Sequence, residues 1–195
     1  MGISATKTDG TPITATGKTP VQTGITSGNV IEYFGRNKDA NGEFVSKQYR
    51  IVVKQANGAT LSQVGYEPKP EWANAIDTLN QQLMHICTRV VDEAEFTKMC
   101  ETAGDDFDAF FTLVETKILP LLQRAKWHVK VVLTENKDGK FFPKLARYPN
   151  FLELDNGTPA TTISNSLAKG ETYTAVYNAK APEAEAANND ADPFA

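Results

Sequence analysis

Two Asn-Gly dipeptides divide the front part of the chain into three strand-like segments. Asn41-Gly42 and Asn57-Gly58 are residue pairs that readily adopt the tight turns of β-hairpins. The segments beside them, 30–34, 44–55 and 60–66, contain many of the β-branched and aromatic residues typical of strands. We therefore expect three consecutive antiparallel strands joined by short turns.

The periodicity changes after a proline-rich link at 68–70. The apolar residues that follow recur at steps of three and four, which places them along one face of a helix. They are Trp72, Ile76, Leu79, Leu83, Ile86 and Val90. A short helix is expected at 93–102, and Asp105 or Asp106 is expected to cap another helix, which Pro120 should kink or interrupt.

The strand pattern returns after the helices. Residues 127–135 alternate in polarity, and this alternation predicts that His128 and Lys130 face outward. The segment 140–145 is expected to return as the partner strand, and 172–177 to add a late strand.

This order of elements is typical of a small antiparallel barrel of the oligonucleotide-binding (OB) type, whose helix lies between the third and fourth strands. We expect a mainly β, α+β domain at 29–179, with a five- to six-stranded OB-like barrel and a helical insert at 69–125. The insert is larger than such barrels usually need, so an α+β sandwich with helices on one sheet face stays open. Residues 1–28 are expected to form a flexible N-terminal arm, and 180–195 a disordered acidic tail.

The sequence offers few residues for catalysis or metal binding. Its two histidines, His85 and His128, accompany no Gly-x-Ser-x-Gly elbow, phosphate-binding loop or dinucleotide fingerprint. His85 and Cys87 would point about 200° apart on a helix, so they could not share a zinc ion there, and Cys100 completes no zinc motif. We expect His85 to be structural, and we expect no enzyme, metal site or cofactor.

The charge is distributed unevenly. The formal net charge of −4 resides in residues 181–195, because the other residues carry 20 basic and 20 acidic side chains. Segment 126–147 has six basic and two acidic residues, interleaved with aromatic ones. Basic grooves with stacking aromatic rings are typical of proteins that hold single-stranded nucleic acid. The candidate binding residues are Tyr33, Phe34, Arg50, Lys54, His128, Lys130, Lys140, Phe142, Lys144, Arg147 and Tyr148.

The end of the chain has a more specific pattern. Its acidic segment finishes in Asp190-Ala191-Asp192-Pro193-Phe194-Ala195. An acidic linker ending in Asp-x-Asp-Pro-Phe resembles the tail of single-stranded DNA-binding proteins of bacteria and bacteriophages, although that family typically ends on the phenylalanine. The divergent phage-encoded group is the nearer likeness.

The resemblance implies a function and its partners. It implies sequence-nonspecific binding of single-stranded DNA in a phage replication or recombination system, with several copies acting together on one strand. It also implies that Asp190, Asp192, Pro193 and Phe194 dock onto replication or recombination proteins, and that the tail competes with DNA for the basic groove.

A virion structural or assembly protein is the alternative. Trp72, Phe107, Phe110 and Phe111 would then contact partner subunits. Neither hypothesis involves a membrane, since the sequence has no apolar run of about 18 residues. Two cysteines cannot form the disulfide framework of a small secreted domain, so we expect a reducing, intracellular setting. The resemblance to phage proteins implies that this setting is the cytoplasm of a bacterial host cell.

Overall fold

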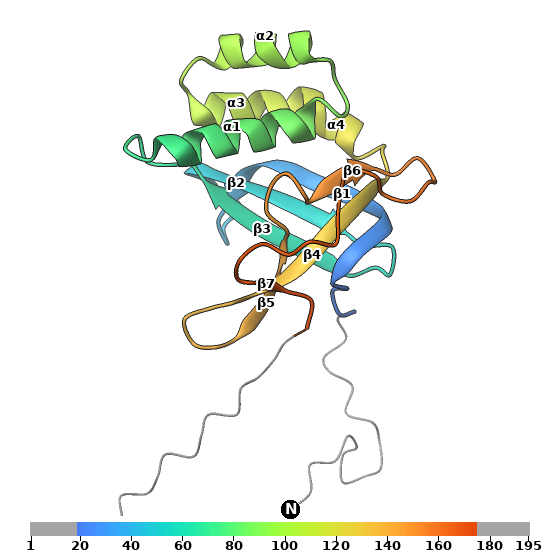
Figure 1. Cartoon of the computed structure of the whole chain (residues 1–195). Coiled ribbons are helices and arrows are strands. Elements are labelled where there is room, and N and C mark those ends of the chain that lie inside the picture. The colour runs from blue at the N-terminus through green and yellow to red at the C-terminus, as the bar shows by residue number, and fades with distance from the viewer. Residues whose placement is uncertain (1–18, 175–195) are drawn as a thin grey trace, which may run out of the picture.

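The computed structural model describes residues 19–174, which form an antiparallel sheet with a layer of helices at one end (Figure 1). The strands are β1 (Gly24–Lys38), β2 (Phe44–Lys54), β3 (Thr60–Tyr66), β4 (Trp127–Glu135), β5 (Phe141–Leu145), β6 (Leu152–Leu154) and β7 (Glu171–Thr172). Between β3 and β4 lie α1 (Ala73–Cys87), α2 (Glu93–Ala103), α3 (Phe107–Leu113), a π-helical turn (Val114–Ile118) and α4 (Leu119–Leu122).

The sheet has the strand order β3-β2-β1-β4-β5, and β6 and β7 also pair with β4. All of these pairings are antiparallel. The expected α+β class, with the helices inserted between the third and fourth strands, is confirmed. The two hairpin turns and the bounds of β3 and β4 also lie where the sequence pattern predicts them.

β1 is longer than expected because it serves two partners. Residues 24–29 pair with β4, whereas Val30–Lys38 pairs with β2. The pairing with β4 shifts register between Thr26 and Asn29, where Gly28 has a φ of 70°. Such a bulge bends the strand, so that it can pass from one partner to the other. Residues 24–28, which the sequence analysis assigns to the N-terminal arm, therefore belong to β1.

The two ends of the strand path, β3 and β5, do not pair as strands in the described part of the chain. A side chain connects them instead, because Gln63 Oε1 accepts a hydrogen bond from the backbone N–H of Leu145 at 3.1 Å. The sheet is accordingly an open one in which its two edges lie near each other. Of the late strand expected at 172–177, Glu171–Thr172 is observed as β7, and residues 175–177 lie outside the described residues.

The helices begin and bend where their residues require. Asp92 and Asp106 cap α2 and α3 by accepting backbone hydrogen bonds from Glu95 and Ala109. Pro120 lacks an N–H and its ring crowds the preceding turn. The chain accommodates it with the π-helical turn directly before α4, so the helix continues with a widened turn instead of stopping.

Aromatic rings form the centre of the core between sheet and helices. Tyr49 stacks on Phe111 with ring centroids 5.0 Å apart, and Phe34 meets Phe111 edge-on at 5.7 Å. Trp127 is fully buried, and its indole N–H donates to the Leu122 carbonyl oxygen at 3.1 Å. These contacts attach the helical layer to β1, β2 and β4.

Candidate nucleic-acid interface

A groove of about 450 Å³ lies at the open seam of the sheet. Residues 60–64 of β3 and Val21 line one side, and residues 142–144 of β5 line the other. Phe142 leaves 47% of its surface exposed, and Lys144 is also exposed. The structure therefore places an aromatic ring and a cation together at this groove.

Two basic residues of β2 stand beside the strand that lines the groove. Arg50 pairs with Val64 and Lys54 pairs with Thr60. Lys54 forms an exposed ion pair with Glu32 at 3.5 Å. Because exposed ion pairs contribute little free energy, Lys54 can exchange this carboxylate for a phosphate.

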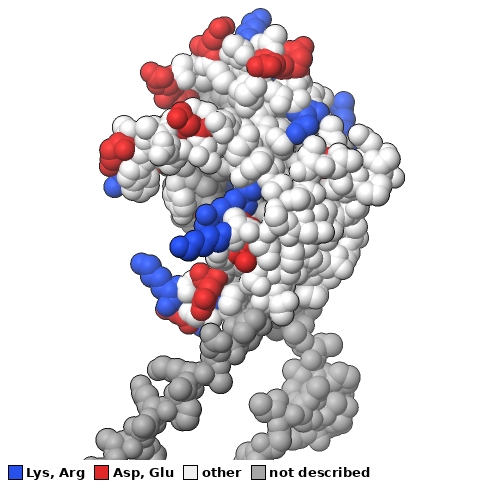
Figure 2. Space-filling view, viewed as in Figure 1, with Lys and Arg blue, Asp and Glu red and all other residues white. Residues whose placement is uncertain are grey.

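The β4–β5 hairpin presents further basic residues. Lys140 and Arg147 are exposed at the two ends of the hairpin's return strand. The turn is ordered by Asn136, whose Oδ1 accepts backbone hydrogen bonds from Asp138 and Lys140 at 3.0 and 2.8 Å. Figure 2 shows that basic side chains gather on the flank below the helical layer, at the left of the view, whereas acidic ones predominate over the helices.

Three predicted aromatic residues are engaged elsewhere. Phe34 is fully buried in the core, so it cannot stack on a base, and this prediction is wrong. Tyr33 is half-buried and its hydroxyl donates to Glu115 Oε1 at 2.9 Å. Burial together with the hydrogen bond to Glu115 raises the pKa of Tyr33. Tyr148 packs edge-on against His85, with ring centroids 5.6 Å apart.

The contacts of His85 within the fold favour the structural role expected for it. Its Nε2 lies 3.0 Å from the Leu152 carbonyl oxygen, and its ring also meets Phe151. Burial lowers the pKa of His85, against the opposing effect of that carbonyl. The residue therefore joins α1 to β6.

The expectation that His128 and Lys130 face outward is wrong, because both are buried. Every residue of β4 from Trp127 to Val132 is buried, so the strand is covered on both faces. The segment after β6 provides the second cover. His128 Nε2 donates to the Thr158 carbonyl oxygen at 2.8 Å, and the Lys130 ammonium donates to that of Ser166.

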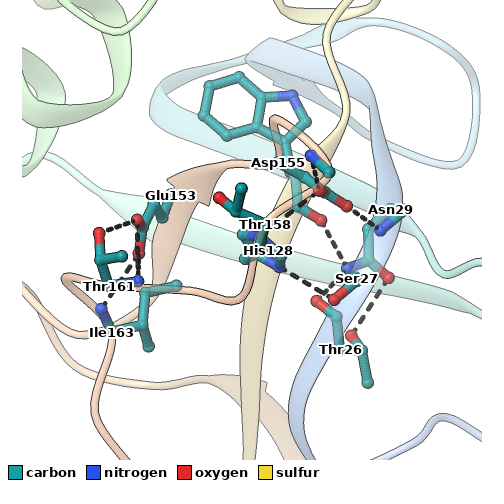
Figure 3. A network of polar contacts seen from close by, with 12 residues as sticks. Thr26, Ser27, Asn29, His128, Glu153, Asp155, Thr158, Thr161 and Ile163 are labelled. Atoms are coloured by element: carbon teal, nitrogen blue, oxygen red, sulfur yellow. Dashed lines mark hydrogen bonds and ion pairs between the residues drawn. The ribbon is translucent and has the colours of Figure 1, made fainter.

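A polar network joins this covering segment to the bulge of β1 (Figure 3). Ser27 Oγ lies 3.0 Å from His128 Nδ1. Asp155 accepts backbone hydrogen bonds from Gly28 at 2.7 Å and from Gly157 at 2.9 Å. The hydrogen bonds from Gly157 and Gly28 lower the pKa of Asp155.

Ser27, His128 and Asp155 are the residue types of a hydrolase triad, yet their arrangement favours a structural role. Asp155 Oδ1 lies 3.5 Å from His128 Nε2, the nitrogen already directed at the Thr158 carbonyl. Both carboxylate oxygens of Asp155 also accept backbone hydrogen bonds. In a triad the carboxylate orients the histidine, whereas here it secures a bulge and a turn.

Glu153 of β6 holds the covering segment at residues 161–163. Its carboxylate accepts hydrogen bonds from the backbone N–H groups of Thr161, Thr162 and Ile163, and from the Thr161 hydroxyl at 2.7 Å. Burial opposes ionisation, but these hydrogen bonds outweigh it and lower the pKa of Glu153 to about 2. Figure 3 shows the carboxylate enclosed by the chain around Thr161 and Ile163.

Two exposed aromatic residues escaped the sequence prediction. Tyr66 is 63% exposed and follows Val64 on the same face of β3. Phe44 is 47% exposed, with the Arg36 guanidinium 3.6 Å and the Lys38 ammonium 4.7 Å from its ring centroid. The alternation within 60–66 could have identified Tyr66, but nothing in the sequence marks the contacts of Phe44.

The aromatic residues invoked for an assembly protein mostly lie in the core. Phe110 and Phe111 are buried and Phe107 is half-buried, whereas Trp72 is 55% exposed. The predicted partner-binding residues Asp190, Asp192, Pro193 and Phe194 lie outside the described residues.

Comparisons with known proteins add no relative. No family model matches the chain, and neither the curated proteins nor the solved structures contain a match. Within residues 19–174, no group of three or more His, Cys, Asp or Glu side chains is placed to hold a metal ion. The helices described for this chain are all too short or too polar to cross a membrane.

Proposed function

We propose that this protein binds single-stranded DNA without sequence preference, through the groove between β3 and β5. The proposal is supported above all by the position of Phe142 and Lys144 across the groove from β3, with Arg50 and Lys54 on the adjoining strand. An OB-like barrel is part of the proposal, because such barrels bind oligonucleotides beside their second and third strands.

The residues suggest a division of tasks. Arg50, Lys54, Lys140 and Lys144 would pair with phosphates, which carry most of the affinity and no sequence information. Phe142 would stack on a base, a contact worth about 1–3 kcal/mol that every base can make. Tyr66 extends the same surface along β3.

The resemblance of the tail supports a role for this activity in a phage replication or recombination system. Phe194 would anchor the tail in a partner protein, while Asp190 and Asp192 pair with basic residues there. Several protomers would act together along one strand, since binding of this kind is commonly cooperative.

Fluorescence anisotropy of a labelled oligo-dT tests the proposal on the full chain. Phe142→Ala and Lys144→Ala should each weaken binding by about fivefold or more. Lys98→Ala, which removes an exposed lysine from α2, serves as the matched control and should bind normally. Affinity should fall steeply as salt rises, and the slope should be shallower for Lys144→Ala.

Absence of binding at low salt would overturn the proposal. The second candidate, a virion structural or assembly protein, is favoured by the exposed Trp72. It requires that the chain form large species by itself, which analytical ultracentrifugation measures, and that it show no affinity for the oligonucleotide.

A further inference from the structure

A second groove, larger than the candidate DNA groove, lies within the helical layer. It has a volume of about 870 Å³ and is bounded by α1, α2, the α2–α3 turn and α3. Its apolar surface comes from Ile76, Leu79, Leu83, Met84, Phe96, Phe107 and Phe110. An apolar groove between helices suits a segment that inserts apolar side chains of its own.

The charged residues at the groove are all acidic. Glu67, Asp105 and Asp106 are among its lining residues, which include no lysine or arginine. The surrounding segment, residues 67–108, contains ten acidic and three basic residues. Figure 2 shows the same excess of acidic side chains over the helices. The electrostatic field therefore favours a cationic occupant.

An exposed tryptophan lies at the N-terminal end of α1. Trp72 directly precedes the first turn of α1. In the sequence it stands between Pro70 and Ile76, which both line the groove. Tryptophan is the residue type most often found at the energetic centre of protein interfaces, and 55% of this one is exposed.

We infer that this groove, which we call the helical groove, docks a basic amphipathic segment of a partner protein. Apolar side chains of that segment would enter the groove, and its lysine or arginine residues would face Asp105 and Asp106, because Glu67 already pairs with Lys47 at 2.8 Å. The acidic end of this chain has the wrong charge for the site. Because the helical groove and the β3/β5 groove share none of their lining residues, a partner and DNA can be bound together.

Tryptophan fluorescence of the protein can report docking. Trp127 is fully buried, so a change in tryptophan emission on docking would come from Trp72. The probe is an amphipathic helical peptide built from leucine and lysine, with a scrambled peptide of the same composition as its control. We expect the amphipathic peptide to shift the emission to shorter wavelength and to bind about tenfold more tightly than the scrambled one.

Variants that add positive charge at the groove locate the site. Gln81→Lys and Asp105→Lys change exposed residues that line the helical groove, and each should weaken peptide binding by about tenfold. Glu101→Lys is the matched control, since it reverses an exposed acid of α2 outside the lining and should have a much smaller effect. Circular dichroism of each variant shows whether it is folded.

Equal weakening by all three variants would overturn the inference, because it would mean general attraction to an acidic surface. Equal affinity for the scrambled peptide would overturn it as well. An emission shift that depends on protein concentration without peptide would assign the groove to a second copy instead. Oligo-dT binding by the groove variants is measured separately, and its failure would bear on the proposed function alone.

Discussion

At the scale of single residues, Gly65 is required because the Tyr49 ring lies close to its backbone. Gly65 of β3 pairs with Tyr49 of β2, and a Cβ at this position would overlap the Tyr49 ring. That ring is held in place by stacking on Phe111 at 5.0 Å, so it cannot easily move aside. Gly65 therefore allows the aromatic core to extend to the edge of the sheet.

Gly65→Ala should consequently destabilise the fold by about 1–3 kcal/mol, the usual cost of overpacking a core. Urea denaturation measures the free energy of unfolding. Ser62→Ala, on the exposed face of the same strand, is the control and should have little effect. A stability of Gly65→Ala equal to that of the parent would show that the Tyr49 ring is not fixed.

Glu115 links the π-helical turn to Arg36 of β1. It lies in the π-helical turn, and its Oε1 accepts a hydrogen bond from the Arg36 backbone N–H at 2.7 Å. Its Oε2 pairs with the Arg36 guanidinium at 2.8 Å. Burial opposes ionisation of Glu115, but hydrogen bonds from Arg36 and Tyr33 prevail and lower its pKa.

At the scale of elements, the covering segment after β6 depends on the Glu153 carboxylate. Folding lowers the pKa of Glu153 from 4.5 to about 2. Between pH 4.5 and pH 2, Glu153 is therefore protonated to a larger extent in the unfolded chain than in the folded protein. The stability contributed by this carboxylate is thus complete above pH 4.5 and is lost as the pH falls toward 2.

Glu153→Gln should lower stability at neutral pH by about 1–2 kcal/mol, because it removes charge-assisted hydrogen bonds to the Thr161 region. The difference from the parent should shrink as the pH is lowered through the acidic range, as chemical denaturation at several pH values would reveal. Glu95→Gln, an exposed substitution on α2, supplies the comparison. A constant difference at every pH would contradict the assignment.

At the scale of the whole molecule, charge is separated between layers. The helical layer is acidic, whereas exposed lysine and arginine residues border the open seam of the sheet. If the tail competes with DNA for this basic flank, Asp190→Asn combined with Asp192→Asn should tighten oligo-dT binding at low salt by about two- to fivefold.

The control for the tail variant changes net charge equally at another place. Glu95→Gln combined with Glu101→Gln removes two acids from α2, and this pair should tighten DNA binding less than the tail pair. Anisotropy titrations of both proteins at one salt concentration make the comparison. Equal effects would mean that net charge alone, and not the tail, sets the affinity.

The sequence by itself determined the order of the main elements, although it did not predict β6 or the full length of β1. Asn-Gly turns, residue alternation and the three-four helical spacing are local properties, so they predicted β2, β3, α1 and β4 with nearly the observed bounds. Phe142, which the sequence analysis names as a candidate binding residue, is exposed on β5. Asp106 was among the two residues expected to cap α3, because capping depends on neighbours along the chain.

Only the tertiary structure decided which faces of the strands are covered. Alternation assigns residues to two faces, but it cannot show that a segment some 30 residues away folds over His128 and Lys130. It also cannot show that Phe34 joins the rings of Tyr49 and Phe111 in the core. Burial depends on segments that come together from distant parts of the chain. For that reason Phe34, His128 and Lys130 drop out of the candidate DNA surface, and the surface proposed for DNA lies at the β3/β5 groove.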